Sequence, residues 1–267
     1  MTPPTGRRRP IGVFDSGVGG LSVLREIRCE LPDENTVYVA DSGYAPYGDR
    51  SATYIEARAI AVVRFLVAQH AKAVVVACNT VTGVAVDRIR AAFDLPIVAI
   101  EPAVKPAVST TKTGIVGVLA TTATLESHNV VRLLATYGAG TIVVAQPCPG
   151  LVDFVEQGDV GSAAARAAVE TYVRPLVEQG ADTVVLGCTH YVFLEPLIRA
   201  VAGPDVAVVN PAPAVARQLR RRLDAAGLLA GPGTPAAEHF FASGDLPTVS
   251  RVLSKLWGRN IHAAALP

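Results

Sequence analysis

Two short apolar runs, each ending in a cysteine, constrain this chain more than any other feature. They read V-V-V-A-C-N-T at residues 74–80 and V-V-L-G-C-T-H at residues 184–190. A short apolar run of this kind is typical of a buried parallel strand, whose carboxyl end here carries a thiol. We therefore expect Cys78 and Cys188 to face each other across one site. Duplication of a structural core cysteine is the alternative, but it does not explain the polar residues that follow both.

The two runs belong to a longer internal repeat. Four segments recur in the same order at offsets of 105 to 110 residues, namely 11–14 and 114–119, 36–40 and 141–145, the two cysteine runs, and 97–102 and 206–211. Such a repeat predicts a duplicated α/β unit.

Helical patterns separate the apolar runs. Apolar residues recur at helical spacing, with Ser51 as a candidate N-cap of the second segment, in 21–31, 52–69, near 84–93, 214–226 and near 246–257. Alternating strands and helices predict parallel sheets with helices on both faces, and ligands in such sheets bind beyond the carboxyl ends of the strands.

The predicted fold class is therefore α/β, with two similar doubly wound parallel-sheet domains related by a pseudo-twofold and an active site in the cleft between them. We expect residues 1–98 plus 210–267 to form the first, discontinuous domain and residues 99–209 to form the second. The segment from Pro211 onward has no partner in the repeat, and we expect it to pack on the first unit.

Composition and charge exclude several classes of protein. The net charge is +1, and besides the basic residues at the start of the chain there is no sustained basic stripe outside Arg220–Arg222, which gives no electrostatic case for nucleic acid. No apolar run approaches the roughly 18 residues that span a bilayer, so we expect no membrane association. The start of the chain lacks the apolar region of a secretory signal, and the four cysteines show no C-x-x-C spacing. These features predict a cytoplasmic protein with free thiols.

The two cysteines suggest acid–base chemistry. A thiol beside a helix N-terminus has a lower pKa than the usual value of about 8.5, because the helix dipole favours the anion. Two thiols on opposite faces of a bound molecule can remove a proton from one side and return one on the other. This is the pattern of a two-base racemase or epimerase, which needs no cofactor.

Polar neighbours of the cysteines fit such a reaction. Asn79, Thr80 and Thr189 offer neutral groups for a carboxylate and an ammonium. D-S-G-V-G-G places Asp15 and Ser16 at a strand end, where backbone N–H groups can form an anion-binding nest. No G-K-[ST] follows, so a nucleotide is not expected. His190 is positioned to tune Cys188, and further ligands for a metal are missing, so no metal is expected.

Other residues have a structural interpretation beside a functional one. Cys29 lies on a helical pattern and is predicted to be a packing residue. Cys148 either lines the cleft or serves a structural loop. Glu156 is either part of the site or a solvated helix residue, and Tyr47 either lines the site or packs within its loop.

Four motifs together resemble the glutamate racemases of the aspartate/glutamate racemase superfamily. They are G-V-F-D-S-G-V-G-G-L-S-V at 12–23, A-D-S-G-Y-A-P-Y-G at 40–48, V-V-A-C-N-T at 75–80 and L-G-C-T-H-Y at 186–191. The match covers nearly the whole chain in order. Val81 and Val192 depart from the usual residues of this family, which affects the expected shape of the cleft rather than its chemistry.

The resemblance implies roles for individual residues. Cys78 would act on the D enantiomer and Cys188 on the L enantiomer, with Asp15, His190 and Glu156 assisting. Glutamate would be bound by a larger set of residues, namely Asp15, Ser16, Ser42, Pro46, Tyr47, Gly48, Asn79, Thr80, Thr189 and His190.

The resulting prediction is a cofactor-independent glutamate racemase that supplies D-glutamate for peptidoglycan synthesis, as a homodimer or in a monomer–dimer equilibrium. Racemases of aspartate or hydantoin stay open as alternatives, as does a glutamate-binding regulatory protein. The presence of two cysteines argues against the one-thiol decarboxylases of the superfamily.

Overall fold

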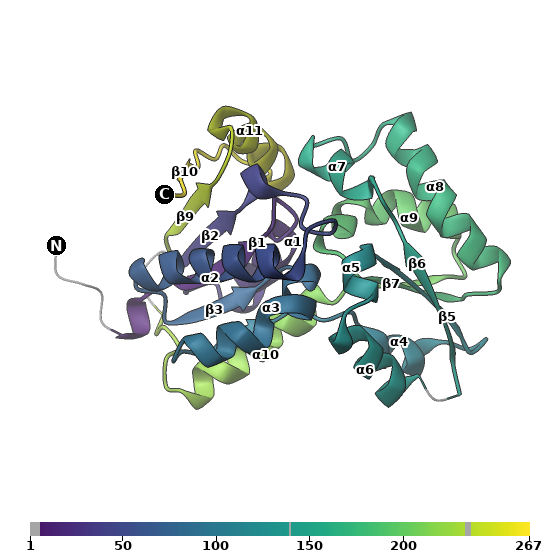
Figure 1. Cartoon of the computed structure of the whole chain (residues 1–267), viewed down its shortest axis with the longest axis horizontal. Helices are drawn as coiled ribbons and strands as arrows, with labels where there is room; N and C mark the ends of the chain where they lie inside the picture. Colours follow the sequence, from purple (N-terminus) through teal and green to yellow (C-terminus); the bar gives the residue numbers. More distant parts are fainter. Residues whose placement is uncertain (1–5, 139, 233–235) are drawn as a thin grey trace.

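The computed structural model describes residues 6–138, 140–232 and 236–267. Figure 1 shows two lobes, each built on a parallel sheet flanked by helices. Within the described part of the chain, no helix combines the length and apolarity needed to cross a membrane.

The two sheets share a strand order. In the first sheet the order is β10-β9-β2-β1-β3-β4, with bounds Ala264–Ala265, Glu238–Ala242, Thr36–Ala40, Ile11–Asp15, Ala73–Val76 and Ile97–Ala99. In the second it is β6-β5-β7-β8, with bounds Ile142–Pro147, Ile115–Ala120, Thr183–Leu186 and Ala207–Val209. The order β2-β1-β3-β4 thus recurs as β6-β5-β7-β8, as the sequence repeat predicts, and the two-domain parallel α/β fold class is confirmed.

Helices cover both faces of each sheet. Their bounds are α1 Leu21–Glu30, α2 Ala52–Ala68, α3 Asn79–Ala92, α4 Val104–Thr110, α5 Thr122–Leu125, α6 His128–Tyr137, α7 Leu151–Glu156, α8 Ala163–Glu178, α9 Glu195–Ala202, α10 Ala212–Ala225 and α11 Leu246–Trp257. Short 3₁₀ helices are η1 Gly6–Arg8, η2 Ser42–Tyr44 and η3 Thr189–Leu194.

Alternation along β1 shows how the first sheet is covered. Ile11 and Val13 belong to the core that includes α1 and α10, whereas Phe14 joins the core on α2 and α3. Two equivalent glycines allow close helix approach, since a Cβ on Gly12 would lie 2.9 Å from the side chain of Leu66 in α2, and one on Gly117 would lie 2.6 Å from Leu176 in α8. The repeat therefore preserves the packing of a helix on the middle of each sheet.

Local signals set several element boundaries. The β2 and α11 bounds are those expected, and the hydroxyl of Ser51 caps α2 by accepting the N–H of Tyr54. In contrast, α3 begins at Asn79, directly after Cys78 and five residues earlier than the expected start near Val84. The cysteine is thus the N-cap residue of this helix.

The C-terminal segment adds to the first sheet. Residues 238–242, for which the sequence suggested no strand, form β9 and pair in parallel with β2 from Thr36 to Ala40. Strand β10 pairs in turn with β9. This pairing supports a discontinuous first domain, although the boundaries near residues 98 and 209 stay predictions.

The prediction for Cys29 is wrong. This side chain is exposed on α1, because it lies outside the stripe formed by Leu24 and Ile27, both fully buried.

Candidate active site

The two thiols occupy equivalent places in the two sheets. Cys78 follows β3 and precedes α3, and Cys188 follows β7 and precedes η3. Both are buried, with 5% and 7% of their surface exposed. Sγ of Cys78 lies 3.5 Å from Oγ of Ser16, whereas Sγ of Cys188 lies 3.7 Å from Nδ1 of His190. The two equivalent thiols therefore have chemically different partners.

The pKa of Cys78 differs from the expectation. Burial raises it, and the negative charges of Asp15 and Cys188 raise it further, whereas the N–H of Val81 lowers it. The helix N-terminus thus acts in the expected direction but is outweighed by desolvation. Cys78 is consequently held as a neutral thiol, the form that donates a proton.

Asp15 is fully buried and interacts with both Cys78 and His190. Its carboxylate accepts the N–H of Ser16 at 2.8 Å and the N–H of Gly20 at 2.7 Å, and it accepts the hydroxyl of Thr189 at 3.2 Å from the second lobe. Burial raises the pKa of Asp15, and the charge of His190 opposes this shift. Asp15 is therefore held by hydrogen bonds from both lobes, and its pKa depends on the charges of His190 and Glu156.

His190 connects Cys188 to Glu156. Its Nε2 lies 2.6 Å from Oε1 of Glu156, and its Nδ1 faces Cys188. Burial would lower the pKa of His190, but hydrogen bonds to Cys188 and Glu156 and the charge of Asp15 raise it well above its ordinary value. A protonated imidazole thus stands beside the sulfur of Cys188.

The expected anion nest is occupied by the protein itself. Besides the N–H groups of Ser16 and Gly20 that bind Asp15, the N–H of Val18 donates to Oε1 of Glu156 at 2.7 Å. The glycine-rich turn therefore orients two carboxylates of the site and is not open to a ligand anion at these three groups. Glu156 is thus a half-buried residue bonded to Val18 and His190 and not a solvated helix residue.

Asn79 and Thr80 begin α3, and the hydroxyl of Thr80 faces the second lobe. Both polar atoms of the Asn79 side chain are buried and have no hydrogen-bond partner among the described residues. Oγ1 of Thr80 lies 3.1 Å from Oγ1 of Thr121 and 3.3 Å from Oγ1 of Thr124. The sequence interpretation missed these two threonines, although the offset of 105 places Thr121 on Ser16.

The loop after β2 carries the remaining expected residues. Oγ of Ser42 donates to Oε2 of Glu156 at 3.1 Å, which ties the loop to the second lobe. The hydroxyl of Tyr47 donates instead to the buried carboxylate of Asp41, and burial and the charge of Asp41 raise the pKa of this phenol. Tyr47 thus holds the loop through Asp41.

Pro46 and Gly48 line a small cavity between the lobes. Its volume is about 60 Å³, and Thr121 and Cys148 form part of its opposite wall. Cys148 is buried, its thiol donates to the carbonyl of Gln146 at 3.3 Å, and burial and the charge of Cys188 raise its pKa. Cys148 therefore lines the cleft as a neutral thiol.

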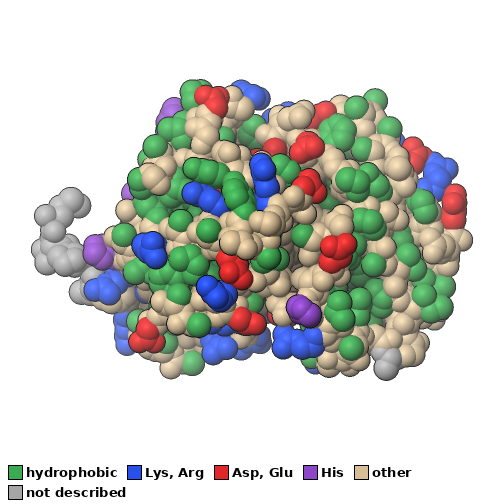
Figure 2. All heavy atoms as spheres, in the orientation of Figure 1, with side chains coloured by type: hydrophobic (Ala, Val, Ile, Leu, Met, Phe, Trp, Pro, Cys, Tyr) green, Lys and Arg blue, Asp and Glu red, His purple; other side chains and the backbone are tan. Residues whose placement is uncertain are grey.

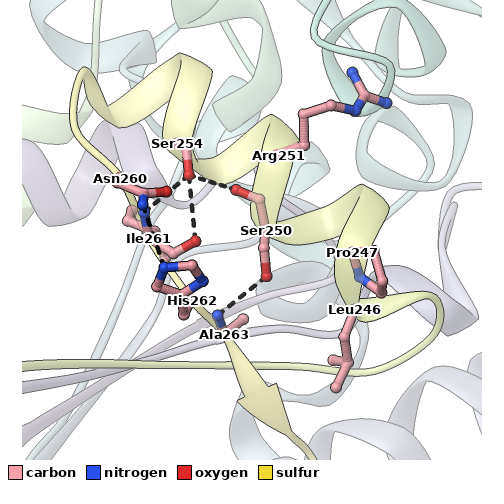
Figure 3. A pocket seen from close by; sticks show the side chains of 9 residues that line it. All are labelled: Leu246, Pro247, Ser250, Arg251, Ser254, Asn260, Ile261, His262 and Ala263. Carbon is pink, nitrogen blue, oxygen red and sulfur yellow. Dashed lines mark hydrogen bonds between the residues drawn. The ribbon is translucent and has the colours of Figure 1, made fainter.

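A larger cavity of about 590 Å³ lies away from this chemistry, between α11 and the C-terminal segment (Figure 3). The hydroxyls of Ser250 and Ser254 accept the N–H groups of Ala263 and Ile261 there, so they fasten this segment to the helix. On the face drawn in Figure 2, acidic and basic side chains are interspersed, and neither sign covers a lobe.

Known proteins share both the sequence and the fold. A family model described as Asp/Glu/Hydantoin racemase matches residues 11–219. The glutamate racemase of Methylococcus capsulatus is 55% identical over 253 residues, which make up 95% of this chain and 93% of that protein.

Solved structures agree over nearly the whole chain. A glutamate racemase isoform of Bacillus anthracis matches with a TM-score of 0.89 and 32% identity, covering 98% of each chain. The glutamate racemase of Escherichia coli, in complex with L-glutamate and the activator UDP-MurNAc-Ala, matches with a TM-score of 0.84 and 32% identity over 96% of this chain and 97% of that one. The sequence, the fold and the paired thiols thus lead to one conclusion: this chain belongs to the Asp/Glu/Hydantoin racemase family.

Proposed function

We propose that this chain is a cofactor-independent glutamate racemase in which Cys78 and Cys188 transfer protons on opposite faces of the substrate. The observation that carries the proposal is the pair of buried thiols at equivalent strand ends with unequal partners. Cys78 is held as a neutral thiol beside Asp15, and Cys188 stands beside a protonated His190. The two thiols thus stand in different electrostatic surroundings, and toward L-glutamate we assign Cys78 the role of acid and Cys188 the role of base.

The proton balance follows from these two states. With L-glutamate, the thiolate of Cys188 removes the α-proton and becomes a thiol, while the thiol of Cys78 gives its proton to the opposite face and becomes a thiolate. D-glutamate leaves, and Cys188 then loses its proton to solvent while Cys78 takes one up, which restores the first state for the next L-glutamate; the reverse reaction runs from the other state. The burial of both sulfurs excludes water, so that charge developing on the substrate is stabilised by fixed donors.

Two features support an α-amino acid as the substrate. The side-chain amide of Asn79 has a buried donor and a buried acceptor without partners among the described residues, a costly arrangement that a bound ligand would relieve. The N-terminus of α3, at which Asn79 and Thr80 lie, favours a carboxylate. Glutamate in particular is supported by the names of the relatives and by the L-glutamate complex of the E. coli protein.

The wider role follows from the product. D-glutamate would supply peptidoglycan synthesis in the cytoplasm, with the enzyme acting as a homodimer or in a monomer–dimer equilibrium. Size measurement in solution over a range of concentrations tests the assembly.

The test is to follow L-glutamate in deuterated water without added cofactor. We expect loss of optical rotation together with deuterium incorporation at the α-carbon. The Cys78→Ser and Cys188→Ser variants should each lose at least about a hundredfold in rate, because a serine hydroxyl is a poor acid and base near neutral pH. Cys29→Ser, which changes an exposed thiol on α1, is the matched control and should retain full activity.

Several outcomes would overturn the proposal. A requirement for added pyridoxal phosphate would remove the cofactor-free scheme. Faster racemization of aspartate or hydantoins than of glutamate would assign another substrate. Tight binding of glutamate without α-proton exchange would indicate a regulatory binding protein.

A further inference from the structure

Asp41, at the carboxyl end of β2, is a fully buried carboxylate with an unusual number of donors. Arg58 in α2 donates to it twice, through Nε at 3.0 Å and through Nη2 at 2.8 Å. Ser243, which follows β9, donates its hydroxyl at 2.8 Å, and the hydroxyl of Tyr47 completes the set. Three separate parts of the chain thus converge on one carboxylate that touches neither thiol.

Arg58 makes a second contact in the same loop. Its guanidinium lies over the ring of Tyr44 at 3.6 Å from the centroid, and its side chain is only 21% exposed. Asp41 and Tyr44 lie on either side of Ser42 in the sequence, so Arg58 contacts the loop both before and after this serine. Lysine has neither the planar fork nor the stacking surface to make both contacts.

Ser42 is connected to Cys188 through a chain of side-chain contacts. Its hydroxyl donates to Oε2 of Glu156, and Oε1 of Glu156 is hydrogen-bonded to Nε2 of His190. The other ring nitrogen of His190, Nδ1, faces Cys188. The N–H of Gly43 donates to the same hydroxyl of Ser243 that binds Asp41, which fixes the backbone beside Ser42. Displacement of the loop would therefore move Glu156 and, through His190, the partner of only one of the two thiols.

From this geometry we propose that Arg58 is a positioning residue for proton transfer by Cys188, acting through Asp41, Ser42, Glu156 and His190. The inference rests on the proposed racemase function and adds a residue outside its acid–base set. Arg58 touches no reacting atom, and its effect is to keep the imidazole of His190 aligned with the sulfur. Because small misalignments of catalytic groups are costly, we expect Arg58→Met to lower kcat/KM by roughly 10- to 100-fold and Arg58→Lys to lower it less.

Rates alone do not identify the affected thiol. The two enantiomers have equal free energy, so kcat/KM must fall by the same factor in both directions. The primary isotope effect on kcat/KM does distinguish the thiols, because Cys188 removes the label from L-[2-²H]glutamate and Cys78 removes it from D-[2-²H]glutamate. When only the Cys188 step slows, the isotope effect rises for the L substrate and falls for the D substrate.

The experiment compares the two isotope effects in wild type, Arg58→Met, Arg58→Lys, Ser42→Ala and the control Arg64→Met. Arg64 is exposed on the same helix, six residues further on. In Arg58→Met and Ser42→Ala we expect a larger isotope effect for the L substrate and a smaller one for the D substrate than in wild type. The change should be smaller in Arg58→Lys and absent in the control. If Arg58→Met does not fold, Ser42→Ala and Arg58→Lys carry the same test.

Isotope effects that keep their wild-type ratio in Ser42→Ala or in folded Arg58 variants would overturn the inference, since a merely structural weakening slows both transfers alike. An inactive wild-type protein would instead refute the proposed function. The two failures are therefore separate.

Discussion

Nε2 of His190 lies 2.6 Å from Oε1 of Glu156, and the same carboxylate oxygen accepts the N–H of Val18 from the other lobe. One oxygen thus holds the imidazole and joins the two lobes beside the site. Together with the contact to Cys188, this contact raises the pKa of His190 in spite of its burial, and it brings the glycine-rich turn after β1 against the candidate site.

The raised pKa of His190 predicts how its contribution to stability depends on pH. In the unfolded chain histidine titrates near pH 6.5, whereas the pKa in the folded protein lies well above this value because of Cys188, Glu156 and Asp15. The stabilisation is therefore complete below about pH 6.5 and is lost as the pH rises through the folded pKa. The contribution of His190 to the free energy of unfolding is measured by urea unfolding of wild type and His190→Gln at pH 6 and at about pH 10. We expect the difference between the two free energies of unfolding to shrink at the higher pH, and a constant or growing difference would contradict the assignment.

Substitution of Gly19 should disturb the same histidine. A Cβ at this position would lie 2.3 Å from Nδ1 of His190, which is too close for any side chain. We expect Gly19→Ala to displace the imidazole and to lower kcat/KM by about a hundredfold or more. Steady-state kinetics measures the loss of activity, and circular dichroism shows whether the variant is still folded, so that displacement of the imidazole is distinguished from misfolding. Gly161→Ala is the control, because a Cβ at Gly161 meets no atom within 4 Å, and equal activity of the two variants would argue against the steric explanation.

Asn79→Ala should affect stability and substrate binding in opposite directions. Removal of a buried amide without partners should leave the free energy of unfolding unchanged or raise it by about 1 kcal/mol, since such groups cost about 1–3 kcal/mol. In contrast, KM for glutamate should rise by at least tenfold, because the amide is expected to bind the substrate. Thermal unfolding and initial rates provide the two measurements. A destabilised variant with unchanged KM would show that the amide has a structural role.

Lys72→Met should destabilise the first domain. Nζ of Lys72 is buried, pairs with Glu34 and donates to the carbonyls of Arg7 at 2.6 Å and Leu228 at 2.8 Å. Loss of this cation leaves Glu34 as an uncompensated buried charge, a change that costs about 3–5 kcal/mol. Urea unfolding of this variant should show the loss. The exposed Lys112→Met variant should unfold like wild type, and an equally small effect at Lys72 would mean that the pair adds little.

Local sequence patterns predict the elements of the repeat but not all of their boundaries. The sequence predicts both cysteines at strand ends, because a short apolar run followed by small polar residues is a pattern of neighbouring positions. The same holds for β2, α11 and the Ser51 cap. The predicted start of α3 is too late, because the pattern of Cys78, Asn79 and Thr80 is that of a strand end, whereas these residues form the cap and first turn of a helix.

Contacts between distant segments decided the rest of the site. Glu156 reaches Val18 across 138 residues, and Ser243 reaches Asp41 across 202, so neither pair has a local pattern that predicts it. The same is true of Thr121 and Thr124, which face Thr80 only after the lobes pack together. Burial likewise reversed the expected direction for the pKa of Cys78, because desolvation depends on every atom that surrounds the thiol.

The sequence by itself determined the duplicated α/β units, the strand ends that carry Cys78 and Cys188, and the family to which they belong, since periodicity and motif spacing are properties of neighbouring residues. The tertiary structure alone decided which carboxylates fill the glycine-rich turn, in which direction the pKa of Cys78 shifts and which side chains hold the loop after β2. Those properties arise from electrostatics and hydrogen bonding between groups that only folding brings together.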